Sequence, residues 1–226
     1  MILIKPFKKN IENWNNRALI YFFILLFIIL AFNTSFNVLA ETEEGVLRAN
    51  IISYSIMDGF NVFLGEENAV LISKANDIRL EANLLQYNLD TEDFLAENEV
   101  FFKSNDFDLF AGKVNGNLSK RNFEASSNIL FKSDDLKIES YLVTYQEEDG
   151  ILNFSGEVSL IHNEIEAKAD KLIYNEIEEK VYLKGNVEGT VLFEQGYWDL
   201  SGGLLEINLA DGTWSISTNP QISFRE

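Results

Sequence analysis

Residues 163–191 read NEIEAKADKLIYNEIEEKVYLKGNVEGTV, and three blocks of equal length precede them, beginning at Asn76, Asn105 and Asp134. The four blocks lie 29 residues apart and align without gaps. Six positions are apolar in every block, and in residues 163–191 they are Ile165, Ala167, Leu172, Val181, Leu183 and Val187. A fixed period in this range predicts stacked supersecondary units that share one core. Such a stack presents a continuous surface or groove rather than a single pocket.

Within a block the apolar residues alternate with polar ones, which is the pattern of a β-strand. In the first block Ile78, Leu80 and Ala82 are separated by charged residues. The apolar parity then slips by one residue, to Leu85 and Tyr87, and the slip recurs at the equivalent place in the other blocks. Because side chains alternate across a strand, the slip requires a bulge or corner if both stretches face one core. A bend placed so regularly predicts a sheet that curls around an apolar interior.

Each block also contains a polar turn and a second alternating strand, so that the units form an antiparallel meander. Degenerate copies cover Gly45 to Ile72 and Trp198 to Phe224, which gives about a dozen strands in six units. Residues 163–180 are rich in Glu, Ala and Lys, which favour helices. Their alignment with three strand-like blocks outweighs that propensity, and we predict an all-β chain.

The first forty residues have the features of a targeting segment. Four cations (Lys5, Lys8, Lys9 and Arg17) precede an apolar run from Ala18 to Phe32, and Val38-Leu39-Ala40 forms a small-residue cleavage site before Glu41. The run is shorter than the ~20 residues that a membrane-spanning helix needs, which favours a cleaved signal peptide. The alternative is a retained anchor; in both cases residues 41–226 are expected to be exported as a single domain.

The composition narrows the class of protein. The chain carries a net charge of −18, and removal of residues 1–40, with four Lys/Arg and one Glu, would make it −21. Nucleic acid is excluded as a partner, because its binding requires Lys and Arg to neutralise phosphates. Solubility or adaptation to salt explains the charge better than a cationic partner does. The chain has no cysteine, so the exported domain is expected to fold without disulfides.

Nothing in the sequence indicates catalysis, a metal or a cofactor. A single histidine, His162, lies at a turn between two units and is expected to be exposed; one histidine does not build a zinc site. The acidic groups at 134–135, 147–149 and 176–179 fall on turns, where solvated charge is the expected role. We therefore expect a protein that is not an enzyme.

The apolar positions have two interpretations, ordinary core packing or a groove for an acyl chain. Small residues are interspersed with large ones at these positions, and a buried methylene contributes about 0.8 kcal/mol, so a lipid tail would be bound firmly. The residues predicted to face the interior and contact lipid are Leu80, Tyr87, Phe94, Phe102, Phe107, Leu109, Phe123, Phe131, Ile138, Tyr145, Phe154, Ile165, Tyr174, Leu183 and Trp198.

The repeat resembles that of the OstA-like family, which includes LptA and LptC of lipopolysaccharide export. The resemblance lies in A-D-K-L-I-Y-N (Ala169 to Asn175) followed by V-Y-L-K-G-N-V (Val181 to Val187). It is weaker in the copy at Ala111, where Gly116 and Ser127 replace the tyrosine and the glycine. The resemblance implies a twisted β-jellyroll, open at both ends, that carries lipopolysaccharide acyl chains through the periplasm without catalysis.

The resemblance also implies head-to-tail strand pairing with other jellyroll proteins of the export bridge, or with further copies of this chain. The expected joining strands lie near Val46 to Ile56 and near Trp214 to Phe224. Pro220 suits an edge position. A cleaved signal favours an LptA-like soluble bridge, and a retained one an LptC-like anchored component. A structural or adhesive β-repeat protein is the alternative from another class.

Overall fold

A computed structural model describes residues 38–41, 45–57, 60–73, 77–194 and 196–225, which belong to one compact unit. The charged and apolar parts of the predicted signal lie outside the described residues. The strands are β1 (Val38–Glu41), β2 (Gly45–Ala49), β3 (Ile51–Met57), β4 (Phe60–Ser73), β5 (Ile78–Asn88), β6 (Asp93–Lys103), β7 (Asp108–Asn117), β8 (Asn122–Ser133), β9 (Leu136–Gln146), β10 (Ile151–His162), β11 (Ile165–Asn175), β12 (Lys180–Phe193), β13 (Gly196–Asn208), β14 (Trp214–Ser217) and β15 (Gln221–Arg225). The prediction of an all-β chain is confirmed. Over the described residues, no helix has the length and apolar character needed to cross a membrane.

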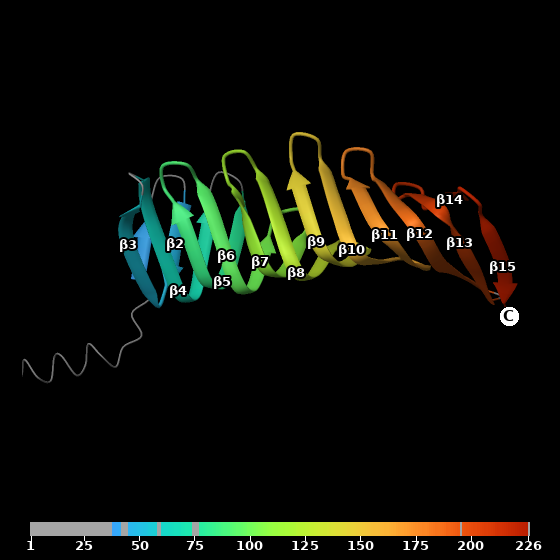
Figure 1. The fold of residues 1–226 in the computed structure, drawn as a ribbon, viewed down its shortest axis with the longest axis horizontal. Coiled ribbons are helices and arrows are strands. Elements are labelled where there is room, and N and C mark those ends of the chain that lie inside the picture. Colours follow the sequence, from blue (N-terminus) through green and yellow to red (C-terminus); the bar gives the residue numbers. More distant parts are fainter. Residues whose placement is uncertain (1–37, 42–44, 58–59, 74–76, 195, 226) are drawn as a thin grey trace, which may run out of the picture. The chain divides into compact units, whose positions relative to one another are not determined.

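All fifteen strands form one antiparallel sheet that follows the chain order (Figure 1). From β4 to β13 each strand pairs with the next, so each predicted 29-residue unit is one pair of strands. The sheet does not close on itself. At one end β4 pairs with both β2 and β3, and at the other end β13 pairs with both β14 and β15.

Every strand from β4 to β13 bends near its middle, and in β5, β7, β9 and β11 the bend lies at the predicted parity slip. The pairing of β5 with β6 shifts register between Glu81 and Leu84, and that of β7 with β8 shifts between Phe110 and Lys113. Equivalent shifts occur in all strand pairs from β4–β5 to β12–β13. Together they form a line across the sheet, here called the crease, along which the sheet folds.

The even-numbered strands from β4 to β12 bend at paired left-handed residues, which the parity pattern did not reveal. Two successive residues with positive φ lie at the crease in each, as in Gly156-Glu157 (φ 81° and 51°) and Gly185-Asn186 (φ 73° and 39°). The corresponding pairs in β4, β6 and β8 are Glu67-Asn68, Asn98-Glu99 and Ser127-Asn128. Two left-handed residues place an extra residue against the partner strand, which bends the chain while the apolar parity continues. Gly185-Asn186, the Gly-Asn of the motif that resembles the OstA-like repeat, therefore lies at the crease.

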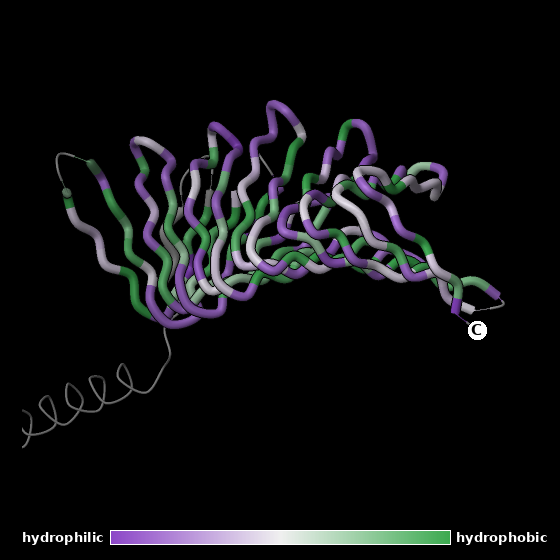
Figure 2. Tube along the Cα trace, turned by 45° about the vertical axis from the view of Figure 1, so that its right-hand side comes forward, coloured by the Kyte–Doolittle hydropathy of each residue, from purple (hydrophilic) through white to green (hydrophobic). Residues whose placement is uncertain are grey.

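The crease divides the sheet into two walls that face each other. The first wall contains the N-terminal halves of the odd-numbered strands and the C-terminal halves of the even-numbered ones; the second wall contains the other halves. Hydrophobic residues lie along the strands and hydrophilic ones gather at the turns (Figure 2). The six positions that are apolar in all four blocks are buried in every block, except at Ile78, which is half-buried and packs against the core.

Candidate functional site

The candidate site is the apolar interior between the two walls. Small residues lie beside the crease, where the walls converge, and include Ala82, Ala111, Ser140 and Ala169. Larger side chains lie farther from the crease, toward the turns. The strands β5, β7, β9 and β11 thus each carry a small residue at the bend. The small residue at the bend of each of these strands lets the two walls approach each other at the crease, and larger side chains fill the space between the walls farther from it.

The structure buries most of the predicted interior residues. Those at most 6% exposed are Leu80, Tyr87, Phe94, Phe102, Phe107, Leu109, Phe123, Phe131, Ile138, Phe154, Ile165 and Leu183. Tyr145 and Tyr174 are half-buried and pack against the same cluster. Their burial agrees with the predicted interior, while their contact with lipid stays a prediction.

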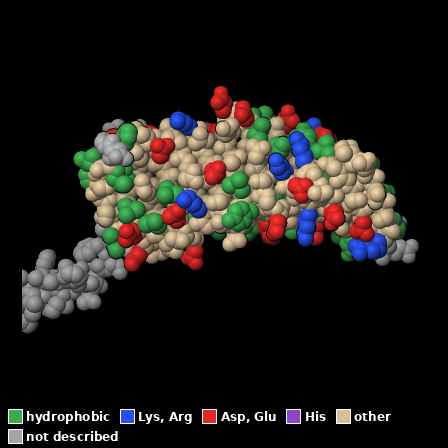
Figure 3. Space-filling model, viewed as in Figure 1, with side chains coloured by type: hydrophobic (Ala, Val, Ile, Leu, Met, Phe, Trp, Pro, Cys, Tyr) green, Lys and Arg blue, Asp and Glu red, His purple; other side chains and the backbone are tan. Residues whose placement is uncertain are grey.

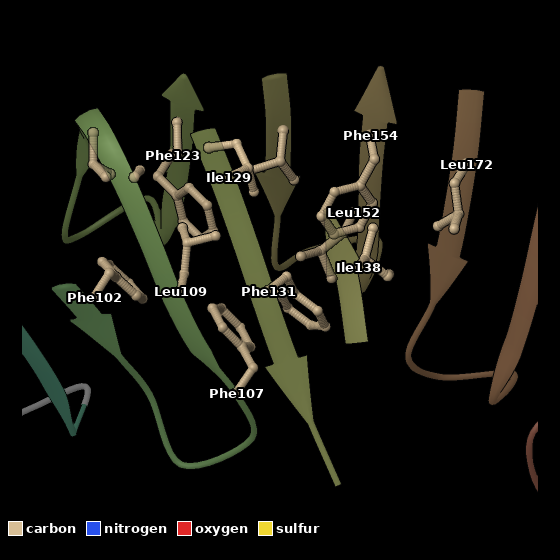
Figure 4. Close-up of a cluster of buried hydrophobic side chains, with 14 of the residues drawn as sticks. Phe102, Phe107, Leu109, Phe123, Ile129, Phe131, Ile138, Leu152, Phe154 and Leu172 are labelled. Atoms are coloured by element: carbon tan, nitrogen blue, oxygen red, sulfur yellow. The ribbon is translucent and has the colours of Figure 1, made fainter. Parts of the chain in front are cut away.

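Aromatic rings join the two walls in the middle of the sheet (Figure 4). Phe102 of the first wall lies 4.9 Å from Phe123 of the second, measured between ring centroids. Phe131 of the first wall contacts Phe154 edge-on at 5.4 Å and Tyr174 at 6.1 Å. Because Phe131 and Phe154 are at most 1% exposed, side chains fill the interior here. A lipid tail would have to displace these rings or part the walls.

Contrary to the prediction, Trp198 is not buried in the interior. Its strand pairing places it opposite the buried Val191, hence on the inner face, but its side chain is 38% exposed. The sheet ends one strand later, so no further unit covers the ring. Phe193 and Phe224 lie beside it on the same face and are also exposed. The C-terminal end of the interior thus presents uncovered apolar side chains.

The predicted joining strands are only partly at the edges. Ile56 lies in β3, Trp214 in β14 and Phe224 in β15, and among the described strands each of these three pairs with a single neighbour. Val46 does not lie in an edge strand, contrary to the prediction, because its strand β2 pairs with β4 on one side and with β1 on the other. The sequence reading assigned most of β1 to the signal. Cleavage before Glu41 would remove Val38, Leu39 and Ala40 from β1 and leave β2 as the edge.

Opposite the crease, the two rows of turns form a lateral opening, here called the mouth. Its lips are the first-wall turns 104–107, 134–135 and 163–164 and the second-wall turns 118–121, 147–150, 176–179 and 209–213. Between β6 and β9 the mouth is nearly closed, with a cavity of about 70 Å³ lined by both lips. Between β10 and β14 it holds about 530 Å³. The mouth is therefore narrow at mid-length and wider toward the C-terminal end.

Backbone hydrogen bonds that repeat with the sequence period fasten the second-wall lip. The N–H groups of Leu118, Glu147 and Glu176 donate to carbonyls of the preceding turn, at 3.0, 3.3 and 2.9 Å. Leu89 and Leu209 continue the series at 2.9 and 2.8 Å. Each turn is thus anchored to its neighbour, and the turns of this lip form one continuous hydrogen-bonded row.

A tyrosine and a glutamate mark the narrow part of the mouth. The Tyr145 hydroxyl donates to a carboxylate oxygen of Glu176 at 3.3 Å, and the Tyr145 ring lies 5.9 Å from that of Phe107 on the opposite lip. Burial raises the pKa of Glu176, and the nearby carboxylates Asp106 and Glu147 raise it further. Burial and the Glu176 charge raise the pKa of Tyr145 as well. Glu176, expected to be a solvated turn charge, is instead half-buried.

His162 also differs from expectation. It is the last residue of β10, pairs with Leu136 and Ile165, and is 7% exposed rather than lying on an exposed turn. Its burial depends on the strands on either side, which no local pattern reveals.

The outer surface of the described residues is polar and charged, with shallow hollows between the strands. Acidic and basic side chains are intermixed on the face shown in Figure 3. A hollow of about 800 Å³ on the outside of the first wall has a mixed lining of serines, lysines and carboxylates. Within the described ranges, no group of three or more His, Cys, Asp or Glu side chains is arranged to hold a metal ion.

These features define a class of protein: an all-β jellyroll of repeated strand pairs, open at both ends, with an apolar interior. A profile of the family described as "LptA/(LptD N-terminal domain) LPS transport protein" matches residues 79–213, more than half of the chain. The chain belongs to this family of lipopolysaccharide transport proteins.

No curated protein gives a significant match to the chain. Among solved structures, the chain is similar to LptH of Pseudomonas aeruginosa, described as the LptA-homologous periplasmic component of the lipopolysaccharide transport device. The two share 10% identity over 68% of this chain and 96% of that one, with a TM-score of 0.29. The family assignment rests on the profile match alone.

Proposed function

We propose that this chain is a non-enzymatic periplasmic carrier that shields lipopolysaccharide acyl chains in its interior during transport from the inner to the outer membrane. The observation that carries the proposal is the continuous apolar interior, which runs from Leu47 in β2 to Ile207 in β13 and ends openly. Family membership supports the cargo class.

The energies favour entry of a tail although side chains fill the interior. A tail of a dozen carbons gains up to about 10 kcal/mol at about 0.8 kcal/mol per methylene, before entropy costs. Separating an aromatic pair costs about 0.5–1.5 kcal/mol beyond its buried area. Because the walls are joined covalently only through the strands that cross the crease, they are able to part at the mouth. The tail then replaces the contacts that the walls lose.

The two ends of the sheet support assembly into a bridge. Trp198 and Phe224 expose apolar surface at the C-terminal end, and Tyr54 and Ile56 do so at the N-terminal end. The free edges there are available for strand pairing with another jellyroll. A soluble LptA-like bridge follows if the leader is removed, and an LptC-like tethered component if it is retained.

Site-specific photo-crosslinking tests the proposal, and the chain offers a matched pair of positions. Phe107 is 6% exposed and faces the interior, whereas Phe110, three residues later, is 40% exposed on the outer face. A photoreactive phenylalanine at each position should crosslink to lipopolysaccharide at 107 and not at 110. Crosslinks confined to 110, or none at either site, would favour a structural or adhesive β-repeat protein.

Assembly has a separate test, because the chain has no cysteine. Ser53 in β3 and Ser215 in β14 are exposed residues of edge strands in the second wall. Single Cys variants at the two positions, mixed and oxidised, should give a disulfide-linked dimer. Ser119→Cys, on a turn away from the edges, is the control. Equal dimer yields from all pairs would argue against end-to-end pairing.

A further inference from the structure

The wide part of the mouth contains features that carriage of acyl chains alone does not explain. Its cavity of about 530 Å³ lies between the first-wall lip at 162–165 and 191–194 and the second-wall residues Gly212 and Trp214. Ile165, Val191, Phe193 and Trp214 supply apolar lining. Glu164 and Glu194 are exposed at its rim. The cavity thus combines an apolar lining with an acidic rim.

His162 lines this cavity, and one of its ring nitrogens is left without a partner. Nε2 lies 3.1 Å from the side-chain nitrogen of Asn163. With Asn163 donating, Nε2 is the acceptor, and the neutral ring carries its proton on Nδ1. Nδ1 is buried and has no hydrogen-bond partner among the described residues. The ring therefore carries an unused, buried N–H donor next to this cavity.

The preceding repeats show that a polar residue at this position is normally satisfied. Ser133 and Ser104 lie 29 and 58 residues before His162. The Ser133 hydroxyl donates to the Asp106 carbonyl at 2.8 Å, and the Ser104 hydroxyl accepts from the N–H groups of Asp106 and Phe107 at 3.2 Å. A buried donor without a partner is costly, so such groups call for an explanation. An acceptor supplied by a ligand is one that fits the cavity.

We propose that the wide part of the mouth binds the head end of an acyl chain, and that His162 Nδ1–H donates to an uncharged oxygen there. The tail passes Ile165 and Val191 into the interior. The oxygen is an ester carbonyl or a hydroxyl close to the head end, because His162 lies at the lip and not at the crease. The carboxylates at the rim disfavour an anionic group at this point. The inference rests on the proposed carriage of acyl chains and adds a recognition point to it.

Binding of three uncharged amphiphiles with equal chain lengths tests the inference. They are tetradecyl glucoside, the tetradecanoyl ester of glucose and its 3-hydroxytetradecanoyl analogue. The first has no carbonyl, the second adds one and the third adds a hydroxyl. Affinities would be measured by native mass spectrometry and by displacement of a fluorescent fatty-chain probe, with the chain as purified. We expect at least one of the two esters, which carry an oxygen on the acyl chain itself, to bind about two- to tenfold more tightly than the glucoside, whose oxygens all belong to the sugar.

The variants separate the donor from the packing. His162→Phe removes the donor and keeps a ring, so it should abolish the preference while glucoside affinity stays within about twofold. His162→Gln keeps an N–H donor and should restore part of the preference. Ser140→Ala is the control, because Ser140 is buried at the crease and its hydroxyl already donates to the Leu142 carbonyl at 3.3 Å.

Each outcome decides a separate question. Equal affinities for the three probes, or a preference that survives in His162→Phe, would overturn the recognition point and leave the carrier function standing. Failure of all three to bind the unmodified chain would overturn both. Which probe gains affinity identifies the oxygen as carbonyl or hydroxyl.

Discussion

Phe131 is the residue whose loss should most directly loosen the two walls. Its side chain is fully buried, and its ring lies 5.1 Å from Phe107, 5.4 Å from Phe154 and 6.1 Å from Tyr174. Truncating a buried phenylalanine to alanine costs about 3–5 kcal/mol, through lost transfer energy and the cavity left behind. Domains are typically stable by about 5–15 kcal/mol, so Phe131→Ala should remain folded but lose a large part of its stability.

Urea unfolding followed by tryptophan fluorescence measures this change. The control is Phe110→Ala, in which the ring removed is 40% exposed and stacks on Phe101 at 4.7 Å on the outer face. Phe110→Ala should lower the free energy of unfolding by about 1 kcal/mol. The same Phe131→Ala variant should bind the tetradecyl probe more tightly, because the cavity removes part of the work of parting the walls. Equal costs for the two variants would refute the inference that cross-wall rings hold the interior closed.

Three further perturbations probe the mouth, the crease and the open end. Burial raises the pKa of Glu176 above 4.5, so between 4.5 and the folded-state pKa the folded state keeps a proton that the unfolded chain has lost, and the free energy of unfolding falls as the pH rises. Glu176→Gln should remove this fall when urea unfolding is measured across a pH series. An unchanged dependence of the unfolding free energy on pH would contradict the assignment. Gly156→Val should lower the Tm and cost about 2 kcal/mol or more, because φ is +81° and the new Cβ would lie 2.8 Å from Tyr141 Cβ. Ser127→Gly at φ +68° should instead gain about 0.5 kcal/mol, and a loss in both would refute the left-handed crease. Trp198→Ser should leave unfolding nearly unchanged but weaken self-association in analytical ultracentrifugation, whereas the reverse pattern would place the ring in the core.

The sequence was sufficient to predict the fold because its signals are local and repeated. Alternation indicated strands, and the slip between Ala82 and Leu85 indicated a bend that the register shift between Glu81 and Leu84 confirms. The bends of the even-numbered strands were missed, since left-handed pairs such as Asn98-Glu99 keep the apolar parity intact. A signal was present, because Asn98, Gly156 and Gly185 lie at multiples of the 29-residue spacing and are residue types that tolerate positive φ.

The misplaced residues share a different cause. Burial of Glu176 and His162 depends on the opposite lip and on neighbouring strands, which lie far away in the sequence. Trp198 has the expected face but lies where the stack ends, so no neighbour covers it. Periodicity specifies which face a residue occupies. It does not specify how many units surround that residue.

Because the 29-residue period has no gaps, the number of repeats sets the length of the apolar interior. Each unit adds two strands spaced about 4.8 Å apart, so one repeat lengthens the interior by roughly 10 Å. Because the sheet is open and each unit contacts mainly its neighbours, the ends are independent of the number of units between them. Excising residues 134–162 would join Ser133 to Asn163 with every crease still in register. Evolution is thus able to change the span of such a protein in steps of one repeat without redesigning its ends.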